Sequence, residues 1–354
     1  MNKALIAMSG GVDSSLAAKL TIDAGYDCIG CTMKLYDNED VGLSRGHTCC
    51  TLDDVEDAKS VAYSLGMPYY VFNFKDGFRE HIIDRFVEAY ESGRTPNPCI
   101  DCNRFMKFDK LFERAEALGC EYIVTGHYAR IEEIDGSYVL KKALDETKDQ
   151  SYVLYSLTQE QLAHIMFPLG GMRKSEVRSL AEESRFINAE KPDSQDICFV
   201  PDGDYGAFLE RYTGKNYVPG DFIDVNGNVL GRHKGTVRYT IGQRKGLGIA
   251  FGKPMYVKSI NVADNTVTLA EDDDLYEDRL VADDFNWISG VIPATEIRCS
   301  ARIRYRHKEQ PAVVYPQADG SVKIIFEEPQ RAITSGQAVV LYDGDTVLGG
   351  GRIR

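Results

Sequence analysis

Length, composition and charge limit the class of protein. The chain has 354 residues, 43% hydrophobic and 27% charged, which suits two or three domains that each bury a core. A net charge of -13 argues against a surface that binds nucleic acid indiscriminately. We expect a cytoplasmic enzyme, because no apolar run is long enough to span a bilayer and Ser9 and Gly10 interrupt the only candidate signal sequence.

The first 200 residues predict alternating strands and helices. Residues 4–7, 28–35, 69–74 and 122–125 have the pattern of buried strands. Apolar residues recur at helical spacing in the segments between them, each of which ends at a glycine. The pattern predicts an α/β fold, a doubly wound parallel sheet that binds ligands at the carboxyl ends of its strands.

Short β-rich segments and turn dipeptides dominate after about residue 200. Asn226-Gly227, Asp319-Gly320 and Asp343-Gly344 are typical of tight turns. We therefore predict a catalytic domain over residues 1–200, a small central domain over 201–280 and a C-terminal β-barrel over 281–354.

A glycine- and serine-rich loop joins the first predicted strand to the first predicted helix. It reads SGGVDSS from Ser9 to Ser15, and backbone N–H groups at such a position bind anions. The loop lacks the lysine of a Walker loop and the third glycine of a dinucleotide loop. It resembles the SGGxDS loop of the ATP pyrophosphatases, which release pyrophosphate from ATP while adenylating a carbonyl oxygen.

The nine cysteines are an odd number, which favours reduced or reactive thiols over a disulfide framework. Cys28 and Cys31 fall in a predicted buried strand on opposite faces, so we expect core packing rather than a zinc site. Cys99 and Cys102 lie in the stiff segment PNPCIDCN, and Cys198 lies in the polar segment SQDICF. A reactive thiol needs electropositive surroundings that lower its pKa. Arg104, Lys107 and Lys191 are nearby in sequence, and either a contribution to that charge or a place on the solvated surface fits them.

Basic residues gather in two later segments. Residues 225–263 contain no Asp or Glu, and residues 298–308 hold a second cluster. Two interpretations stay open: local contacts to the phosphates of RNA, or solvated loops. His127 follows a predicted strand end, and we expect a structural hydrogen bond there rather than a general base.

The order of the motifs resembles the tRNA-specific 2-thiouridylases of the MnmA family. Those enzymes carry SGGVDSS, PNPxxxCN, TGHYA, KDQSY, SQDICF, GQRKGLG and an RYR segment. The corresponding residues here are 9–15, 96–103, 125–129, 148–152, 194–199, 242–248 and 304–306. The resemblance covers essentially the whole chain and implies ATP-dependent conversion of the wobble uridine of tRNA to 2-thiouridine.

The resemblance also implies the roles of individual residues. Cys198 would carry a persulfide sulfur from a cysteine desulfurase or a sulfur-relay protein, and Cys102 would attack or resolve that persulfide. Asp13 would act through Mg²⁺ bound to the pyrophosphate. The implied ATP-binding residues are Ala7, Met8, Ser9, Gly10, Gly11, Val12, Asp13, Ser14, Met33 and Gly126, and the implied tRNA-binding residues are Asn97, Pro98, Cys99, Lys148, Asp149, Gln150, Arg304 and Tyr305.

Three alternatives remain open at this point. The chain is compatible with another ATP pyrophosphatase, either a synthetase that acts on a small carboxylate or a different tRNA thiolase, although only the first loop supports it. It is also compatible with a non-catalytic RNA-binding protein. Cys99 stands where many family members have Asp, so an acid role for that residue does not carry over. An iron-sulfur cluster held by Cys99, Cys102 and Cys198 is less favoured than the persulfide route, because four cysteines are the common ligand set.

Overall fold

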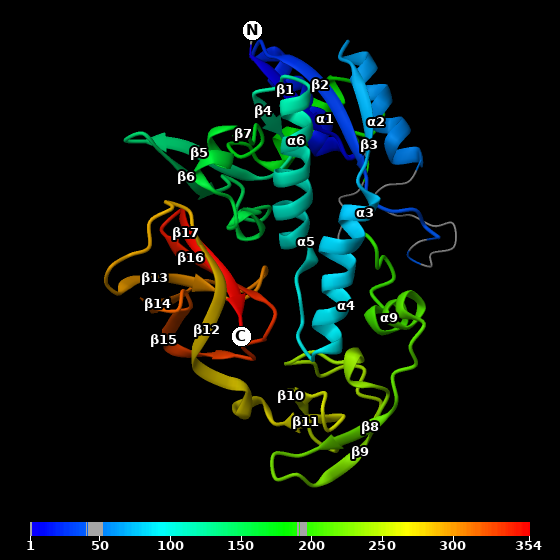
Figure 1. The fold of residues 1–354 in the computed structure, drawn as a ribbon, viewed down its shortest axis with the longest axis vertical. Coiled ribbons are helices and arrows are strands. Elements are labelled where there is room, and N and C mark those ends of the chain that lie inside the picture. The colour runs from blue at the N-terminus through cyan, green and yellow to red at the C-terminus, as the bar shows by residue number, and fades with distance from the viewer. Residues whose placement is uncertain (1, 40, 42–51, 190, 192–196) are drawn as a thin grey trace.

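The computed structural model describes residues 2–39, 41, 52–189, 191 and 197–354. Its chain forms an N-terminal α/β part, a small central β part and a C-terminal barrel (Figure 1). Ser194, Gln195 and Asp196 of the predicted SQDICF segment lie outside the described residues.

A five-stranded parallel sheet is the core of the N-terminal part. The strand order is β3-β2-β1-β4-β7, and every neighbouring pair is parallel. The chain moves outward from β1 to β3 and then returns to the other side of β1, so the direction of winding switches between β1 and β4, where such folds bind ligands. The strands are β1 (Lys3–Ala7), β2 (Asp27–Lys34), β3 (Tyr69–Asn73), β4 (Tyr122–Val124) and β7 (Ile165–Met166).

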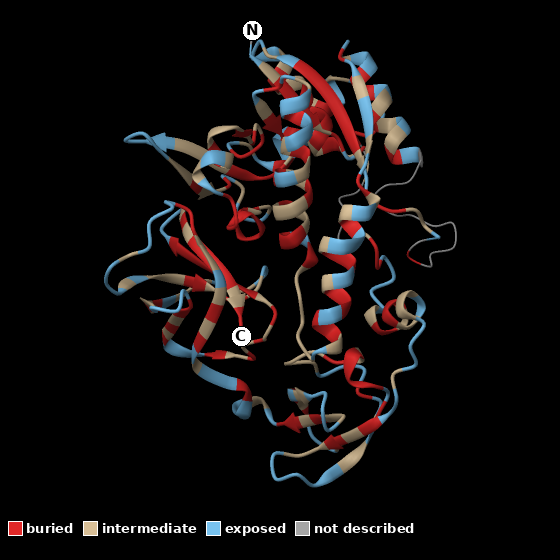
Figure 2. Ribbon diagram, viewed as in Figure 1, coloured by how far each residue is buried: buried red, intermediate tan, exposed pale blue. Residues whose placement is uncertain are grey.

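Helices cover both faces of this sheet. In β1, Ala4 and Ile6 join the hydrophobic cluster that includes Leu16 of α1, while Leu5 joins the opposite cluster with Phe86 of α4. Burial alternates with exposure along α4, as expected for a helix packed on a core (Figure 2). The predicted doubly wound fold is therefore confirmed. The helices named so far, with three more that pack on the sheet, are α1 (Val12–Asp23), α2 (Leu52–Ser64), α4 (Asp84–Glu91), α6 (Leu111–Ala117) and α8 (Lys174–Glu183).

Two helical runs contain π-helical winding, which the sequence did not reveal. In η2 the Leu111 N–H donates to the Met106 carbonyl, five residues earlier. Such winding is rare and is frequent at functional sites, and here it begins at Cys102. The first run is α3 (Lys75–Phe78), η1 (Arg79–Ile83) and α4, and the second is α5 (Pro98–Asp101), η2 (Cys102–Lys110) and α6.

A β-hairpin leaves the N-terminal part and reaches the barrel. Its strands β5 and β6 pair antiparallel, and Lys141 of β6 pairs with Thr346 of β17. The turn is Asp135-Gly136, a hairpin dipeptide that our sequence analysis overlooked. This stretch consists of β5 (Ala129–Ile134), β6 (Ser137–Lys142), η3 (Ser151–Leu154) and α7 (Gln159–Ala163).

The central part has its own four-stranded sheet of order β10-β11-β8-β9. Its core includes Phe222, Val257, Val267 and Leu269. The elements are α9 (Tyr205–Thr213), β8 (Gly220–Ile223), β9 (Val229–His233), η4 (Thr236–Arg238), β10 (Tyr256–Asn261), β11 (Thr266–Ala270) and η5 (Asp272–Leu275).

The C-terminal part is a closed six-stranded antiparallel barrel, as predicted. Its order is β12-β15-β14-β13-β16-β17, and β12 also pairs with β17. A Cβ at Gly350 of β17 would lie 2.7 Å from the ring of Tyr155, so the barrel meets the N-terminal part closely there. The strands are β12 (Tyr276–Trp287), β13 (Ile297–Arg302), β14 (Gln310–Pro316), β15 (Val322–Arg331), β16 (Ala338–Asp343) and β17 (Thr346–Ile353).

Candidate active site

The Ser9–Ser15 loop connects β1 to the N-terminus of α1. No side chain caps that helix end, so its first N–H groups remain available to an anion. Ser14 Oγ accepts from Ser9 N at 3.2 Å and donates to the Gly11 carbonyl at 3.0 Å. Gly10 has a φ of 75°, and a Cβ there would lie 2.4 Å from the Asp54 carbonyl oxygen, so only glycine fits.

The Asp13 carboxylate is bound to partners within the protein. Lys174 Nζ donates to its two oxygens at 2.7 and 2.8 Å, and the Tyr128 hydroxyl donates at 2.7 Å. Lys174 is buried. A buried charge is costly without a partner, so Asp13 holds α8 and Tyr128 against the loop in this structure.

The other implied ATP-binding residues lie at the same edge of the sheet. Ala7 ends β1 and Met8 follows it, and Met33 lies near the carboxyl end of β2. Gly126 follows β4, and a Cβ there would lie 2.8 Å from Ser14 N. The two loops on either side of the switch point therefore touch, and Gly126 has to be glycine for this approach.

Asn188 and Lys191 stabilise the nucleotide loop through contacts that sequence reasoning missed. Asn188 Nδ2 donates to the Gly10 carbonyl at 2.9 Å and to Ser15 Oγ at 3.0 Å. Lys191 Nζ lies 2.6 Å from Asp54 and 2.7 Å from Asp57. These are contacts between residues far apart in the chain, and no local pattern marks them.

The cysteine segment begins with a short helix capped by Asn97. Asn97 Oδ1 accepts from Cys99 N at 3.2 Å, and Pro98 occupies the first turn. Cys99 is exposed and Cys102 is half-buried. The Asp101 carboxylate forms an ion pair with Arg352 of the barrel, and the guanidinium lies 3.1 Å from it.

Cys198 approaches the same core as Cys102. Both residues pack against the hydrophobic cluster that contains Phe86 and Phe199. The Cys198 carbonyl accepts from the Tyr36 hydroxyl at 2.6 Å. Neither cysteine is in a disulfide, so the structure brings the two predicted thiols to one core in the reduced state.

The expected lowering of the thiol pKa is wrong for Cys102. Burial raises the pKa of Cys102 to about 11, against a smaller opposing effect of Lys107. Arg104 is paired with Asp284 at 2.6 Å, and Lys191 is paired with Asp54 and Asp57. Desolvation depends on how the fold buries the sulfur, so its size could not be predicted from local sequence.

Cys28 and Cys31 are buried, as predicted. Cys28 belongs to the cluster on one face of the sheet and Cys31 to the cluster on the other. Within the described residues, no group of three or more His, Cys, Asp and Glu side chains is arranged to hold a metal ion.

Two of the implied tRNA-binding segments, residues 148–150 and 304–305, touch each other. The Tyr305 hydroxyl donates to the Asp149 carbonyl at 3.2 Å, and Gln150 Oε1 accepts from Tyr128 N at 2.9 Å. The Asp149 side chain is buried and accepts from Ser151 and Ala143. Arg304 is half-buried and donates to the carbonyls of residues 331 and 332.

Acidic side chains neutralise part of the two basic segments. Arg232 pairs with Asp221 at 2.9 Å, Arg238 with Glu210 at 2.7 Å and Lys253 with Glu271 at 2.5 Å. Arg244, Lys245, Arg306 and Lys308 are exposed, and no described acidic side chain forms an ion pair with them.

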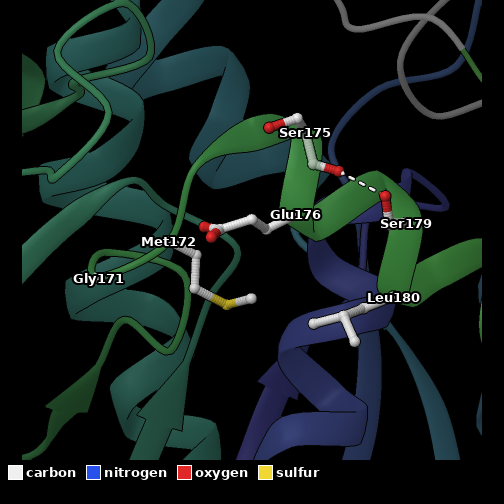
Figure 3. A pocket seen from close by; sticks show the side chains of 6 residues that line it. All are labelled: Gly171, Met172, Ser175, Glu176, Ser179 and Leu180. Atoms are coloured by element: carbon white, nitrogen blue, oxygen red, sulfur yellow. Dashed lines mark hydrogen bonds between the residues drawn. The ribbon is translucent and has the colours of Figure 1, made fainter.

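An open pocket lies beside the first turns of α8 (Figure 3). Ser179 Oγ donates to the Ser175 carbonyl at 3.1 Å on its wall. The pocket contains none of the predicted site residues. Its lining residues are Gly171, Met172, Ser175, Glu176, Ser179 and Leu180.

Comparison with known families defines the class of protein. Residues 2–202 match the family described as tRNA methyl transferase HUP domain, residues 206–271 its PRC-barrel domain, and residues 277–353 the aminomethyltransferase beta-barrel domain. The chain is thus a nucleotide-binding α/β catalytic domain followed by two β domains.

Two curated relatives extend over nearly the whole length. The chain is 51% identical to a tRNA-specific 2-thiouridylase MnmA of Acetivibrio thermocellus, covering 99% of each chain. It is 50% identical to the enzyme of the same name from Clostridioides difficile, covering 99% of this chain and 98% of that one. The chain therefore belongs to the MnmA family of tRNA-specific 2-thiouridylases.

A solved 4-thiouridine synthetase in complex with RNA and ATP aligns with 20% identity and a TM-score of 0.39, covering 60% of this chain and 50% of that one. That likeness is too weak to inform the site. None of the helices in the described part of the chain combines the length and apolar character needed to cross a bilayer.

Proposed function

We propose that this protein is an ATP-dependent tRNA sulfurtransferase that replaces the C2 oxygen of the wobble uridine with sulfur. The observation that carries the proposal is the placement of an uncapped, glycine-dependent anion loop and two reduced cysteines around one sheet. The family supplies the substrate class, and the chain retains the loop, Cys102 and Cys198.

The first step is activation of the uridine. The N–H groups at the start of α1 bind the phosphates of ATP, and the C2 oxygen attacks the α-phosphorus as pyrophosphate leaves. The helix dipole stabilises the phosphate charge. Adenylation is needed because the C2 oxygen is a poor leaving group until it is bonded to AMP.

The second step is sulfur transfer. The terminal sulfur of a persulfide on Cys198 bonds to C2, and AMP leaves with the former C2 oxygen. The Cys102 thiolate then bonds to Cys198 Sγ, which breaks the persulfide S–S bond and leaves the sulfur on C2. The resulting disulfide between Cys102 and Cys198 is reduced by an external thiol before the next turnover.

Mg²⁺ would enter this site with the nucleotide. Proteins commonly hold Mg²⁺ through one or two carboxylates and the substrate phosphates, yet Asp13 is occupied by Lys174 and Tyr128. The described residues therefore fit an ion carried mainly by the phosphates of ATP, where it would neutralise their charge.

We further propose that tRNA contacts two surfaces. Asn97, Pro98 and Cys99 would approach the target base, and the group formed by Lys148, Gln150 and Tyr305 would contact the tRNA nearby. Asp149 and Arg304 would shape this second surface from within, because their side chains bond to other parts of the protein.

The persulfide sulfur would come from a cysteine desulfurase or a sulfur-relay protein. The reduced cysteines suit the cytoplasm, where we expect the enzyme to act.

The decisive experiment combines reconstitution with genetics. Purified protein, ATP, Mg²⁺, unmodified tRNA and a persulfide donor should yield 2-thiouridine, detected by nucleoside mass spectrometry, and cells lacking the protein should lose that nucleoside. Pyrophosphate release with small carboxylates but not with tRNA would instead support a different ATP pyrophosphatase. Tight tRNA binding without any ATP-dependent product would support a non-catalytic RNA-binding protein.

A further inference from the structure

A short chain of hydrogen bonds links the cysteine helix to the loop after β4. Lys107 Nζ lies 3.4 Å from His127 Nε2, and His127 Nδ1 lies 2.6 Å from Thr125 Oγ1. A lysine ammonium only donates hydrogen bonds, so Nε2 accepts from Lys107. Nδ1 then carries the ring proton and donates a hydrogen bond to Thr125 Oγ1. His127 is therefore a neutral imidazole in this arrangement.

The surroundings of His127 favour the same state. The side chain is buried, and its ring packs against Phe108 and Phe167 at centroid distances of 6.0 and 5.6 Å. Burial, with a smaller effect of Lys107, lowers the pKa of His127 well below its usual value. The ring is thus fixed in position as an uncharged acceptor for Lys107.

The π-helical winding of η2 puts Lys107 about one turn after Cys102, near enough for its charge to act on the Cys102 sulfur. Residues five apart lie one turn apart along a π-helix, and η2 begins at Cys102. The other cations of η2 are neutralised, since Arg104 lies 2.6 Å from Asp284 and Lys110 lies 2.8 Å from Glu113. In the described part of the chain, no carboxylate forms an ion pair with Lys107.

The remaining charged groups near Cys102 oppose ionisation of its thiol. Burial, Cys99 and Asp101 all raise the pKa of Cys102, and Lys107 lowers it. The Asp101 carboxylate is itself paired with Arg352 and lies 3.7 Å from Arg85. Of the charged residues with the largest effects on Cys102, Lys107 is the one that favours an anion at this sulfur.

We propose that Lys107 stabilises the Cys102 sulfur anion, and that His127 is a positioning residue that holds Lys107 beside it. The inference rests on the proposed function, in which Cys102 must act as a thiolate. It also gives the loop after β4 a second task, because Gly126 of the same loop contacts the nucleotide loop.

Alkylation of Cys102 tests the proposal without ATP, tRNA or a sulfur donor. The Cys99→Ser background leaves one thiol, Cys102, in the tryptic peptide of residues 95–104. The alkylation rate with neutral iodoacetamide reports how readily Cys102 ionises, and the rate with anionic iodoacetate relative to it reports the local charge. In Lys107→Gln we expect the iodoacetamide rate at pH 8 to fall about tenfold, as for a rise of about one pKa unit. The ratio of iodoacetate to iodoacetamide rates should fall as well, which a purely structural change would not produce.

Three further variants sharpen the test. Lys107→Arg should restore both the rate and the ratio, and His127→Phe should lower both by part of the Lys107→Gln effect. Lys110→Gln, the matched control on the same helix, should match the parent. Lys107→Met keeps the apolar stem and replaces Lys107→Gln if that variant unfolds.

Parent-like rates and ratios in folded Lys107→Gln or Lys107→Met would overturn the proposal. Failure of the wild-type protein to make 2-thiouridine would instead contradict the proposed function, and the alkylation result would stand apart from it.

Discussion

The nucleotide loop and the cysteine segment are held in different ways. Gly10 and Asp13 are bound by Asn188 and Lys174, which belong to the same N-terminal part. The cysteine segment is bound by the barrel: Thr95 N donates to the Ser335 carbonyl at 2.9 Å, and Arg104 and Asp101 pair with Asp284 and Arg352. Adenylation should therefore tolerate changes in the barrel, and sulfur transfer should not.

The largest effect should come from the two reactive thiols. Cys102→Ser and Cys198→Ser should each eliminate 2-thiouridine formation, because neither the persulfide nor its resolution can occur with a hydroxyl. Both variants should still release pyrophosphate with tRNA, and Cys99→Ser should keep part of the thiolation activity. Nucleoside mass spectrometry and a pyrophosphate assay measure the two steps. Equal inactivity of all three variants, together with a strict need for iron, would favour the cluster route.

The nucleotide loop should show the opposite behaviour. Ser14→Ala removes a hydroxyl that bridges Ser9 and Gly11, and we expect pyrophosphate release to fall about a hundredfold, as when one preorganised donor is lost. The Cys198 persulfide should form normally. Persulfide formation is followed by intact-mass measurement, and normal pyrophosphate release by a folded variant would refute the assignment of the loop.

Substitution of Asp13 should change the stability of the protein as well as its activity. Asp13 forms an ion pair with buried Lys174, so its removal affects folding as well as the nucleotide site. Asp13→Ala should destabilise the protein by about 3 kcal/mol, because it leaves a buried charge unpaired. Asp13→Asn keeps an acceptor and should cost less. Denaturant unfolding of the two variants measures the difference, and equal stability would contradict the ion pair.

The pair of Arg352 and Asp101 tests the contact between the barrel and the cysteine segment. Arg352→Ala should reduce thiolation about tenfold while pyrophosphate release stays near normal, and it should cost roughly 1–3 kcal/mol of stability. Asp101→Asn combined with Arg352→Gln should recover part of that stability, since no carboxylate is then left unpaired. Equal losses of thiolation and pyrophosphate release would show that Arg352→Ala disturbs the whole protein rather than the cysteine segment.

The smallest effect should come from the exposed basic residues. Lys245→Gln with Arg306→Gln should lower the log-log salt dependence of tRNA binding by about two, if each contacts one phosphate. Lys253→Gln with Arg232→Gln is the matched control, because acidic side chains already neutralise both. Equal slopes for the two double variants would mean that these loops are solvated surface only.

Much of the fold was predictable because it depends on local sequence patterns. The strands at residues 4–7 and 122–125 and the loop between strand and helix follow from apolar runs and glycine positions. The hairpin contact between Lys141 and Thr346 and the π-helical winding at Cys102 depend on tertiary packing, which has no local pattern. The same holds for Lys174 and Arg352, whose partners lie far away in the chain.

Cys198 is proposed to carry the sulfur that enters the tRNA, and labelled sulfur tests this assignment. Iron-free protein is incubated with a persulfide donor labelled with heavy sulfur, freed of the donor, and then given ATP, Mg²⁺ and tRNA in a single turnover. We expect one labelled sulfur on the Cys198 peptide before ATP is added, and its transfer to 2-thiouridine afterwards with loss from that peptide. Labelled 2-thiouridine formed by Cys198→Ser, or a persulfide on Cys198 that remains after tRNA is thiolated, would contradict it.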